Sequence, residues 1–159
     1  MRGKIGKLFF SLAICQLAGI IGGIFNAVSN CTWYFTINKP SFSPPDWVFG
    51  PVWVILYLLI GIALFLVWTT NSPGNNKHSA MILFFIQLVF NTSWTFFFFF
   101  LENPYLALVD IILLLIFTLL TVWKFYSVNR TAGYLMLPYL LWVGFATVLN
   151  YSIWTLNRP

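Results

Sequence analysis

The stretch WYFTINKPSFSPPDWVFGPVWVILY, residues 33–57, decides the fold of this chain. It holds four of the eight prolines and three of the eight tryptophans of the sequence. The prolines in its first half exclude a regular helix there, because proline lacks an N–H donor and restricts the residue before it. From Trp47 onward an apolar run begins, and Pro51 falls in the first turns of the helix it predicts, where proline is tolerated. We therefore expect a structured aromatic loop over 29–46 that leads into a helix.

The composition surrounding this stretch is that of a membrane protein. Of the 159 residues, 60% are hydrophobic, 21% aromatic and 7% charged. A soluble domain carries about 25% charged residues, so this chain cannot build a water-exposed surface. The sequence predicts an all-α integral membrane fold, one domain over 1–159 with a bundle of five transmembrane helices. The apolar runs of spanning length lie at about 8–28, 47–70, 79–100, 104–126 and 131–156.

The net charge of +5 is distributed unevenly over the two sides that five spans define. Basic residues near the membrane collect on the cytoplasmic side, so the pattern predicts a cytoplasmic N-terminus and an outer C-terminus. This explains the basic excess without a nucleic-acid partner. The compact chain and the lack of a recognisable targeting segment favour a bacterial inner membrane. One side holds Arg2, Lys4, Lys7, Lys77, Lys124 and Arg130, and the other holds Lys39 and Arg158.

The second predicted span carries an aromatic stripe. Phe49, Trp53 and Tyr57 recur every four residues and share a face of the helix. An interfacial belt accounts for rings at the very end of a span. It accounts less well for Trp53 and Tyr57, which lie about 10–15 Å along the helix. We interpret these two rings as lining an internal pocket.

The third predicted span carries a polar stripe. Gln87, Asn91, Trp94 and Thr95 fall at i, i+4, i+7 and i+8 on one face. Polar amides in hydrocarbon need hydrogen-bond partners, so this face is expected to point into the bundle. Contacts between helices and the wall of a pocket are both consistent with the pattern. The phenylalanine run over 96–100 is expected to face lipid or to pack, without chemistry.

Three further features stand out in the remaining spans. Asp110 is the acidic residue inside a span, and a buried carboxylate is either functional or held by structural hydrogen bonds. We favour the structural role and keep Asp110 among the candidate site residues. Gly19 and Gly23 form a small-xxx-small pattern that fits a dimer contact and packing within the bundle equally well. In the fifth span Trp142 is expected near the membrane midplane, and Pro138 is expected to kink the helix.

These residues resemble the translocator-protein family, also known as TspO/MBR or the tryptophan-rich sensory proteins. The resemblance extends over nearly the whole chain and all five spans. It is carried by Trp33, Tyr34, Lys39, Pro40, Pro44, Pro45, Trp53, Tyr57, Gln87, Leu88, Asn91, Trp94, Asp110, Pro138, Tyr139, Trp142 and the run over 146–150.

The resemblance implies a function that the residues alone do not give. It implies a homodimeric five-helix bundle, contacting membrane lipid, with a pocket for tetrapyrroles such as protoporphyrin IX and haem and for benzodiazepine-site ligands. No cofactor is required and no metal site is expected, the porphyrin being a ligand used in sensing, transport or porphyrin homeostasis. The expected ligand-binding residues are Tyr34, Pro44, Trp53, Tyr57, Asn91, Trp94, Trp142 and Ala146 from the resemblance, with Thr95 and Asp110 added from the polar positions.

An alternative function follows from the same resemblance. Some bacterial members degrade porphyrin in light and oxygen, and Trp53 and Trp142 match the tryptophans involved. In that case these two residues are the catalytic residues. Both functions remain open at the level of the sequence.

Overall fold

The computed structural model describes residues 2–28, 31–71 and 74–158, and the regular structure within these ranges is entirely helical. Five helical segments there are long and apolar enough to cross a membrane, with a mean hydropathy of 1.6 to 2.6. This confirms the predicted all-α membrane fold. The segments are α1 (Arg2–Val28), α3 (Asp46–Thr69), α4 (Gly74–Thr95) with the π-helical turn η1 (Phe96–Phe100), α5 (Pro104–Val128), and α6 (Arg130–Leu135) followed by α7 (Leu137–Leu156).

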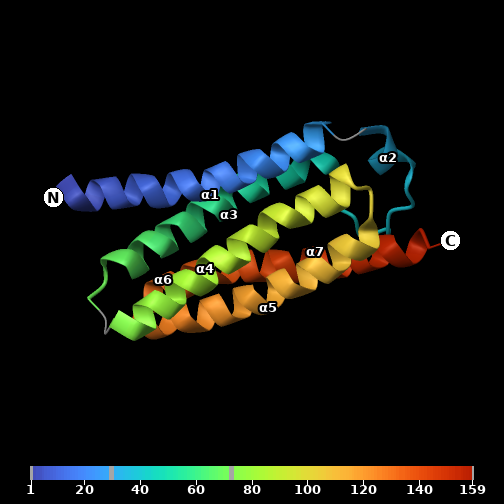
Figure 1. Cartoon of the computed structure of the whole chain (residues 1–159). Coiled ribbons are helices and arrows are strands. Elements are labelled where there is room, and N and C mark those ends of the chain that lie inside the picture. The colour runs from blue at the N-terminus through green and yellow to red at the C-terminus, as the bar shows by residue number, and fades with distance from the viewer. Residues whose placement is uncertain (1, 29–30, 72–73, 159) are drawn as a thin grey trace.

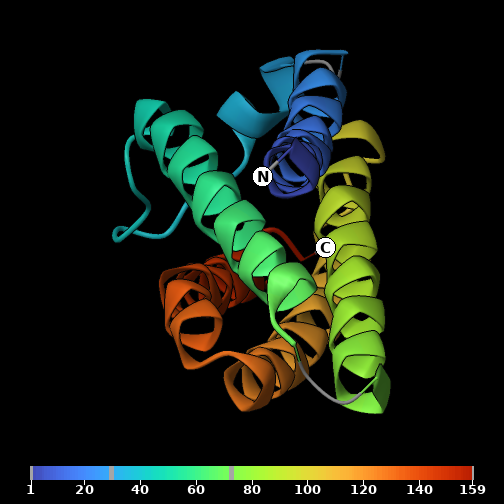
Figure 2. The same cartoon turned by 90° about the vertical axis from the view of Figure 1, so that its left-hand side faces the viewer.

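The long helices run along a common direction as an elongated bundle (Figure 1). Helix α1 packs against α3 and α4, α4 packs against α5, and α5 packs against α7. Helices α3 and α7 touch each other far less, which leaves room between them. The first and last described residues lie at opposite ends of the bundle (Figure 1). Figure 2 shows the same bundle end-on. We call the end that carries α2 (Cys31–Thr36) the α2 end and the opposite end the α1-start end.

Two helices begin earlier than the sequence predicted. Helix α1 starts at Arg2 instead of position 8, and α4 starts at Gly74 instead of position 79. Both extensions are polar or basic turns. Their low hydropathy places them outside the predicted spans, although no residue in them prevents a helix. His78, expected in a loop, therefore lies in the first turns of α4, where its side chain is exposed.

The loop predicted over 29–46 contains the short helix α2, and its residues 29–30 lie outside the described ranges. Beyond α2 the prolines keep the chain irregular, as predicted. The loop is fastened to the end of α7 by a pair of hydrogen bonds. The Asn38 backbone N–H donates to Asn157 Oδ1 at 2.9 Å, and Asn157 Nδ2 donates to the Asn38 carbonyl oxygen at 2.9 Å. The loop consequently lies as a cover over the α2 end.

The fifth span is interrupted where Pro138 was expected to kink it. Helix α6 ends at Leu135, and α7 begins at Leu137 with Pro138 in its first positions. The start of α6 is capped by Asn129, whose side chain accepts from the Ala132 N–H at 3.1 Å. Proline at a helix start costs little because the N–H it lacks has no partner there. At the place of the predicted kink the regular α-helix is interrupted at Met136, whose backbone stays in the right-handed helical region.

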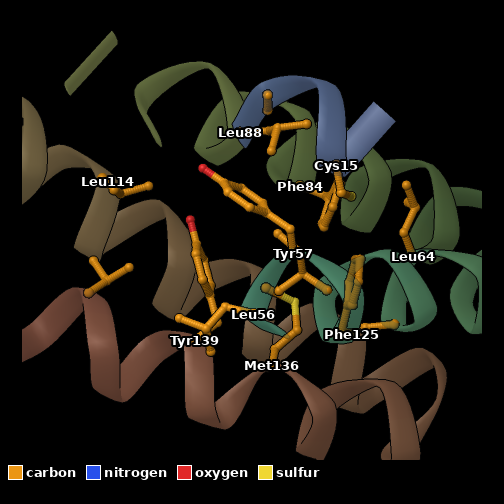
Figure 3. Close-up of a cluster of buried hydrophobic side chains, with 14 of the residues drawn as sticks. Cys15, Leu56, Tyr57, Leu64, Phe84, Leu88, Leu114, Phe125, Met136 and Tyr139 are labelled. Atoms are coloured by element: carbon orange, nitrogen blue, oxygen red, sulfur yellow. The ribbon is translucent and has the colours of Figure 1, made fainter. Parts of the chain in front are cut away.

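The interior of the bundle is filled by apolar side chains from all the long helices (Figure 3). Phe84 of α4 and Phe125 of α5 are fully buried, with ring centroids 5.5 Å apart and planes inclined by 10°. Large apolar side chains also cover the outside, for example Phe9 at 74% and Leu141 at 74% exposure. An apolar exterior of this kind fits contact with lipid.

Candidate functional site

A cavity of about 510 Å³ opens at the α2 end, between α1, α3, α4, η1 and α7. Its size falls in the range of small-molecule sites. Helices α3 and α7 diverge here, so side chains from both can reach the space between them. The lining consists of Gln16, Gly19, Ile20, Gly22, Gly23, Asn26, Trp33, Tyr34, Phe35, Asp46, Phe49, Gly50, Trp53, Val54, Tyr57, Asn91, Trp94, Thr95, Phe98, Phe99, Trp142, Ala146, Leu149, Asn150 and Ile153.

Ten of the 25 residues that line the cavity are aromatic. Trp53 stacks on Tyr57 within α3, with centroids 5.5 Å apart and an interplanar angle of 27°. Phe49 of α3 meets the ring of Trp142 of α7 edge-on at 5.9 Å, which joins the two helices that otherwise diverge. Neighbouring rings that hold one another at fixed angles are pre-organised for stacking with a flat ligand.

A chain of hydrogen bonds runs from Tyr57 and Asn91 in the cavity lining to Tyr139 and Gln87 in the core behind it. The Tyr57 hydroxyl donates to Asn91 Oδ1, Asn91 Nδ2 donates to the Tyr139 hydroxyl at 3.1 Å, and that hydroxyl donates to Gln87 Oε1 at 2.7 Å. All four residues are buried, and the rings of Tyr57 and Tyr139 carry their hydroxyl groups on the same side of the cluster (Figure 3). The polar stripe predicted on the third span is therefore engaged by α3 and α7, as buried amides require.

A second amide links the aromatic wall to the next helix. Trp94 Nε1 donates to Asn150 Oδ1 at 2.8 Å, and Asn150 Nδ2 donates to the Pro104 carbonyl oxygen at 2.9 Å. That carbonyl lies in the first turn of α5. Asn150 is 1% exposed, so its two hydrogen bonds fix both its own orientation and the tilt of the Trp94 ring.

The cover of the cavity includes a charged contact. Lys39 Nζ lies 3.7 Å from the centroid of the Tyr34 ring and 3.5 Å from Asp46 Oδ1. Burial, with a smaller contribution from the Asp46 carboxylate, raises the pKa of Tyr34 to about 12. At neutral pH Tyr34 therefore keeps its proton and presents a neutral hydroxyl group beside the cavity.

Glycines of α1 form the opposite wall. A Cβ atom at Gly19 would lie 2.6 Å from a ring carbon of Tyr57, whereas one at Gly23 would meet nothing within 4 Å. Gly19 thus allows α1 to approach α3 closely. For Gly19, the structure favours packing within the bundle over contact with a second copy of the chain.

Known proteins resemble this chain over nearly its whole length. A model of the TspO/MBR family matches residues 11–155. The chain is 41% identical over 157 residues to "Tryptophan-rich protein TspO" of Chlorobaculum tepidum, covering 99% of both chains. It is 43% identical over 154 residues to the protein of the same name from Archaeoglobus fulgidus, covering 97% of this chain and 99% of that one. The chain belongs to the TspO/MBR family.

This TspO/MBR protein also shares 36% identity over 146 residues with human "Translocator protein", covering 90% of this chain and 85% of the human one. The family resemblance expected from the sequence is therefore confirmed. The relatives come from bacteria, an archaeon and mammals, so the fold is not confined to one kind of cell.

The bundle brings together eight of the ten residues that the sequence nominated for the site. The two that do not reach the lining are Pro44 and Asp110. Pro44 lies half-buried in the loop that covers this TspO/MBR cavity. The eight residues that line the cavity are Tyr34, Trp53, Tyr57, Asn91, Trp94, Thr95, Trp142 and Ala146.

Asp110 lies at the contact between α4 and α5. Asp110 is 5% exposed, and its Oδ1 accepts a hydrogen bond from Ser93 Oγ at 2.7 Å. Ser93 stands on the face of α4 away from the cavity stripe. The structural interpretation of Asp110 therefore fits its position better than a place in the ligand site of this TspO/MBR protein.

Five aromatic residues of the cavity lining were not among the site residues nominated from the sequence, namely Trp33, Phe35, Phe49, Phe98 and Phe99. Phe98 and Phe99 belong to the phenylalanine run that was expected to carry no chemistry, yet both line the cavity. Phe98 and Phe99 lie four residues after Trp94 and Thr95, so they continue the inward stripe of the third span. Phe98 is stacked on Trp94, with ring centroids 5.1 Å apart. The run ends in a π-helical turn, in which the Leu101 N–H donates to the Phe96 carbonyl oxygen at 3.0 Å. The spacing of four residues from the polar stripe was the signal available beforehand.

Proposed function

We propose that this protein binds planar tetrapyrroles, with protoporphyrin IX as the model ligand, for sensing, transport or porphyrin homeostasis. The observation that carries the proposal is the cavity of about 510 Å³ in which stacked and edge-on rings surround two fixed amide groups. A macrocycle offers a large flat apolar face to such rings. Synthetic benzodiazepine-site ligands, which are also flat and aromatic, are proposed to use the same cavity. Supporting evidence from the comparisons is membership of the TspO/MBR family.

The free-base porphyrin is proposed to be preferred over haem. Haem iron in proteins is usually held by histidine, cysteine or methionine, and less often by tyrosine. The cavity lining formed by the described residues includes none of the first three. Of its two tyrosines, Tyr57 donates its hydroxyl hydrogen bond to Asn91, and Tyr34 keeps its proton because its pKa is raised to about 12. An iron-bearing ligand thus gains little from its metal here.

Binding is tested by titrating purified protein in detergent with protoporphyrin IX in darkness and following the shift of its main absorption band. We expect saturable binding that Trp53→Phe and Trp142→Phe weaken by less than tenfold, because phenylalanine keeps most of the apolar ring. Trp47→Phe is the matched control, since Trp47 lies on the same helix as Trp53 but is 76% exposed. Absence of saturable binding by the wild-type protein would refute the proposed function.

A second candidate function is light- and oxygen-dependent degradation of the bound porphyrin. The observation that favours it is that two readily oxidised indoles, Trp53 and Trp142, face the same cavity and that Trp53 stacks on a tyrosine. Illuminating the titrated samples in air distinguishes the two candidates. An enzyme should lose porphyrin absorption rapidly, and either phenylalanine variant should slow the loss far more than it weakens binding. Stable absorption under light and oxygen would leave the tryptophans as walls of a binding site.

We also propose a place and an assembly for the protein. The excess of basic residues at the α1-start end supports a cytoplasmic N-terminus, an outer C-terminus and a bacterial inner membrane. The homodimer that family resemblance implies is proposed to use lipid-facing residues, because Gly19 faces Tyr57 of its own chain.

Single cysteines test this orientation in a background from which Cys15 and Cys31 have been replaced by serine. Ser41→Cys, in the exposed loop at the α2 end, should react with a membrane-impermeant reagent added to intact spheroplasts. Asn76→Cys, exposed at the start of α4, should react only after permeabilisation. Labelling of both from outside would contradict the five-span arrangement, and the reverse pattern would invert it.

A further inference from the structure

A second cavity lies at the α1-start end, opposite the aromatic one. It is an open cleft with a volume of about 320 Å³, lined by the beginning of α1, the end of α3 and the beginning of α4. These three segments lie at the same end of the bundle (Figure 1). Its lining consists of Gly3, Lys4, Lys7, Trp68, Thr69, Asn71 and Lys77, which we call the lysine cleft.

Three lysines converge on this cleft from two helices. Lys7 Nζ lies 5.3 Å from the ring centroid of Trp68, and Lys77 Nζ donates to the Thr70 carbonyl oxygen at 3.2 Å. Lys4, one turn before Lys7, is exposed. Lys7 is thus held half-buried beside an indole, and Lys77 is held half-buried against the end of α3. Holding like charges together costs free energy, so an anion in the cleft would be stabilised.

No carboxylate within the described part of the chain neutralises these lysines. The sequence has three acidic residues, of which Asp46 begins α3 and Glu102 precedes α5, both at the α2 end. The third, Asp110, is buried between α4 and α5 against Ser93. Over residues 2–28, 31–71 and 74–158 the salt bridge observed is that of Lys39 with Asp46. The positive charge of the cleft is uncompensated.

The general preference for basic residues on one side of a membrane does not explain the cleft. Lys124 and Arg130 lie at the same end, but Lys124 lies 4.9 Å from the ring of Trp123 of its own helix and Arg130 lies 5.8 Å from the ring of Tyr126 of α5. Neither contributes to the cleft. Basic residues at any exposed positions of this end would satisfy the preference for positive charge on one side of the membrane. The lysines of α1 and α4 instead lie around the same lysine cleft.

The lining also offers groups for the rest of a lipid. Trp68 presents an apolar ring at the level where tryptophan anchors spans among headgroups. Asn71 supplies a polar side chain, whereas the Thr69 hydroxyl donates to the Phe65 carbonyl oxygen of its own helix at 2.8 Å. A Cβ at Gly3 would meet nothing within 4 Å, so α1 leaves space open there. We propose that the lysine cleft binds the phosphate group of an acidic phospholipid, with phosphatidylglycerol as the probe, and that its first acyl carbons lie along Trp68. The lipid would tie the start of α1 to α3 and α4.

The test compares two double variants of equal charge in neutral detergent. Lys7→Gln with Lys77→Gln removes the cleft lysines, and Lys124→Gln with Arg130→Gln removes two cations elsewhere at the same end. Phosphatidylglycerol, added to wild-type protein, should raise the midpoint of thermal unfolding, and phosphatidylcholine should not. The cleft variant should need about tenfold or more phosphatidylglycerol for the same rise, because each lysine near a lipid anion is worth about fivefold in affinity. The control variant should respond as the wild type does.

Equal weakening in the two double variants would overturn the proposal, since diffuse surface charge would then suffice. An equal rise with inorganic phosphate at the same concentration would overturn the assignment to a lipid. If the cleft double variant does not fold, Lys4→Gln replaces it, because that exposed side chain is dispensable for packing. It should require about fivefold more phosphatidylglycerol than wild type. An unchanged response of Lys4→Gln would then count against the cleft.

Discussion

Gly19→Ala is expected to lower the midpoint of thermal unfolding by about 3–10 °C, although it adds a single methyl group. The new Cβ would lie 2.6 and 2.8 Å from two ring carbons of Tyr57. That ring is 6% exposed, stacked on Trp53 and hydrogen-bonded to Asn91, so it cannot swing away without breaking other contacts. Overpacking of this kind costs about 1–3 kcal/mol. Ligand affinity should fall together with stability, because Tyr57 also lines the cavity.

Gly23→Ala is the matched control for this prediction. Gly23 lies one turn further along α1 and lines the same cavity, but a Cβ there meets open space. Replacing a glycine within a helix by alanine without a clash gains up to about 1 kcal/mol. Gly23→Ala should therefore unfold at the wild-type temperature or above it. Equal destabilisation by the two substitutions would mean that helix α1 does not depend on the close approach to α3.

Asn91→Leu is expected to destabilise the bundle by about 1–3 kcal/mol. The substitution keeps the size of the side chain but removes the acceptor of the Tyr57 hydroxyl and the donor to the Tyr139 hydroxyl. Both hydroxyl groups stay buried, so water cannot replace the lost partner at the same cost. The measurement is thermal unfolding in detergent, combined with the porphyrin titration, since Asn91 lines the cavity.

Thr92→Val serves as the control on the neighbouring residue. Its hydroxyl donates to the Leu88 carbonyl oxygen of its own helix at 3.1 Å, a bond that joins no two helices. We expect its effect on stability to be within about 0.5 kcal/mol. If Asn91→Leu were as stable as Thr92→Val, the hydrogen-bond chain across α3, α4 and α7 would contribute nothing to the bundle.

Much of this architecture could be predicted because hydrocarbon imposes strong rules on sequence. Trp53, Tyr57, Asn91 and Trp94 were placed on inward stripes by spacing alone, and all four line the cavity. Helical periodicity fixes which residues share a face, and the cost of an unpaired amide in lipid fixes the direction of that face. Pro138 likewise predicted the interruption before α7, because proline lacks an N–H donor.

Periodicity also indicates Phe98, which lies four residues after Trp94, although five identical residues over 96–100 mark no face by their composition. Other details depend on information that periodicity does not hold. Asp110 can be recognised in the sequence because burying a carboxylate in a membrane helix costs free energy. Which neighbour it contacts depends on the rotation of α5 against α4. The same holds for Gly19, whose partner could be another helix of either the same chain or a second copy.

The hydrogen bonds between Asn38 and Asn157 determine when the cavity can be completed during synthesis. The two residues are 119 positions apart, so the ribosome delivers the loop long before the side chain that anchors it. Contacts of such long range form late, because the intervening segments must be ordered first. A nascent chain that has inserted α1, α3 and α4 already has three walls, but its cover is not yet fastened. We therefore expect the cavity to be completed in a late step, when α7 docks and the amide of Asn157 reaches the loop.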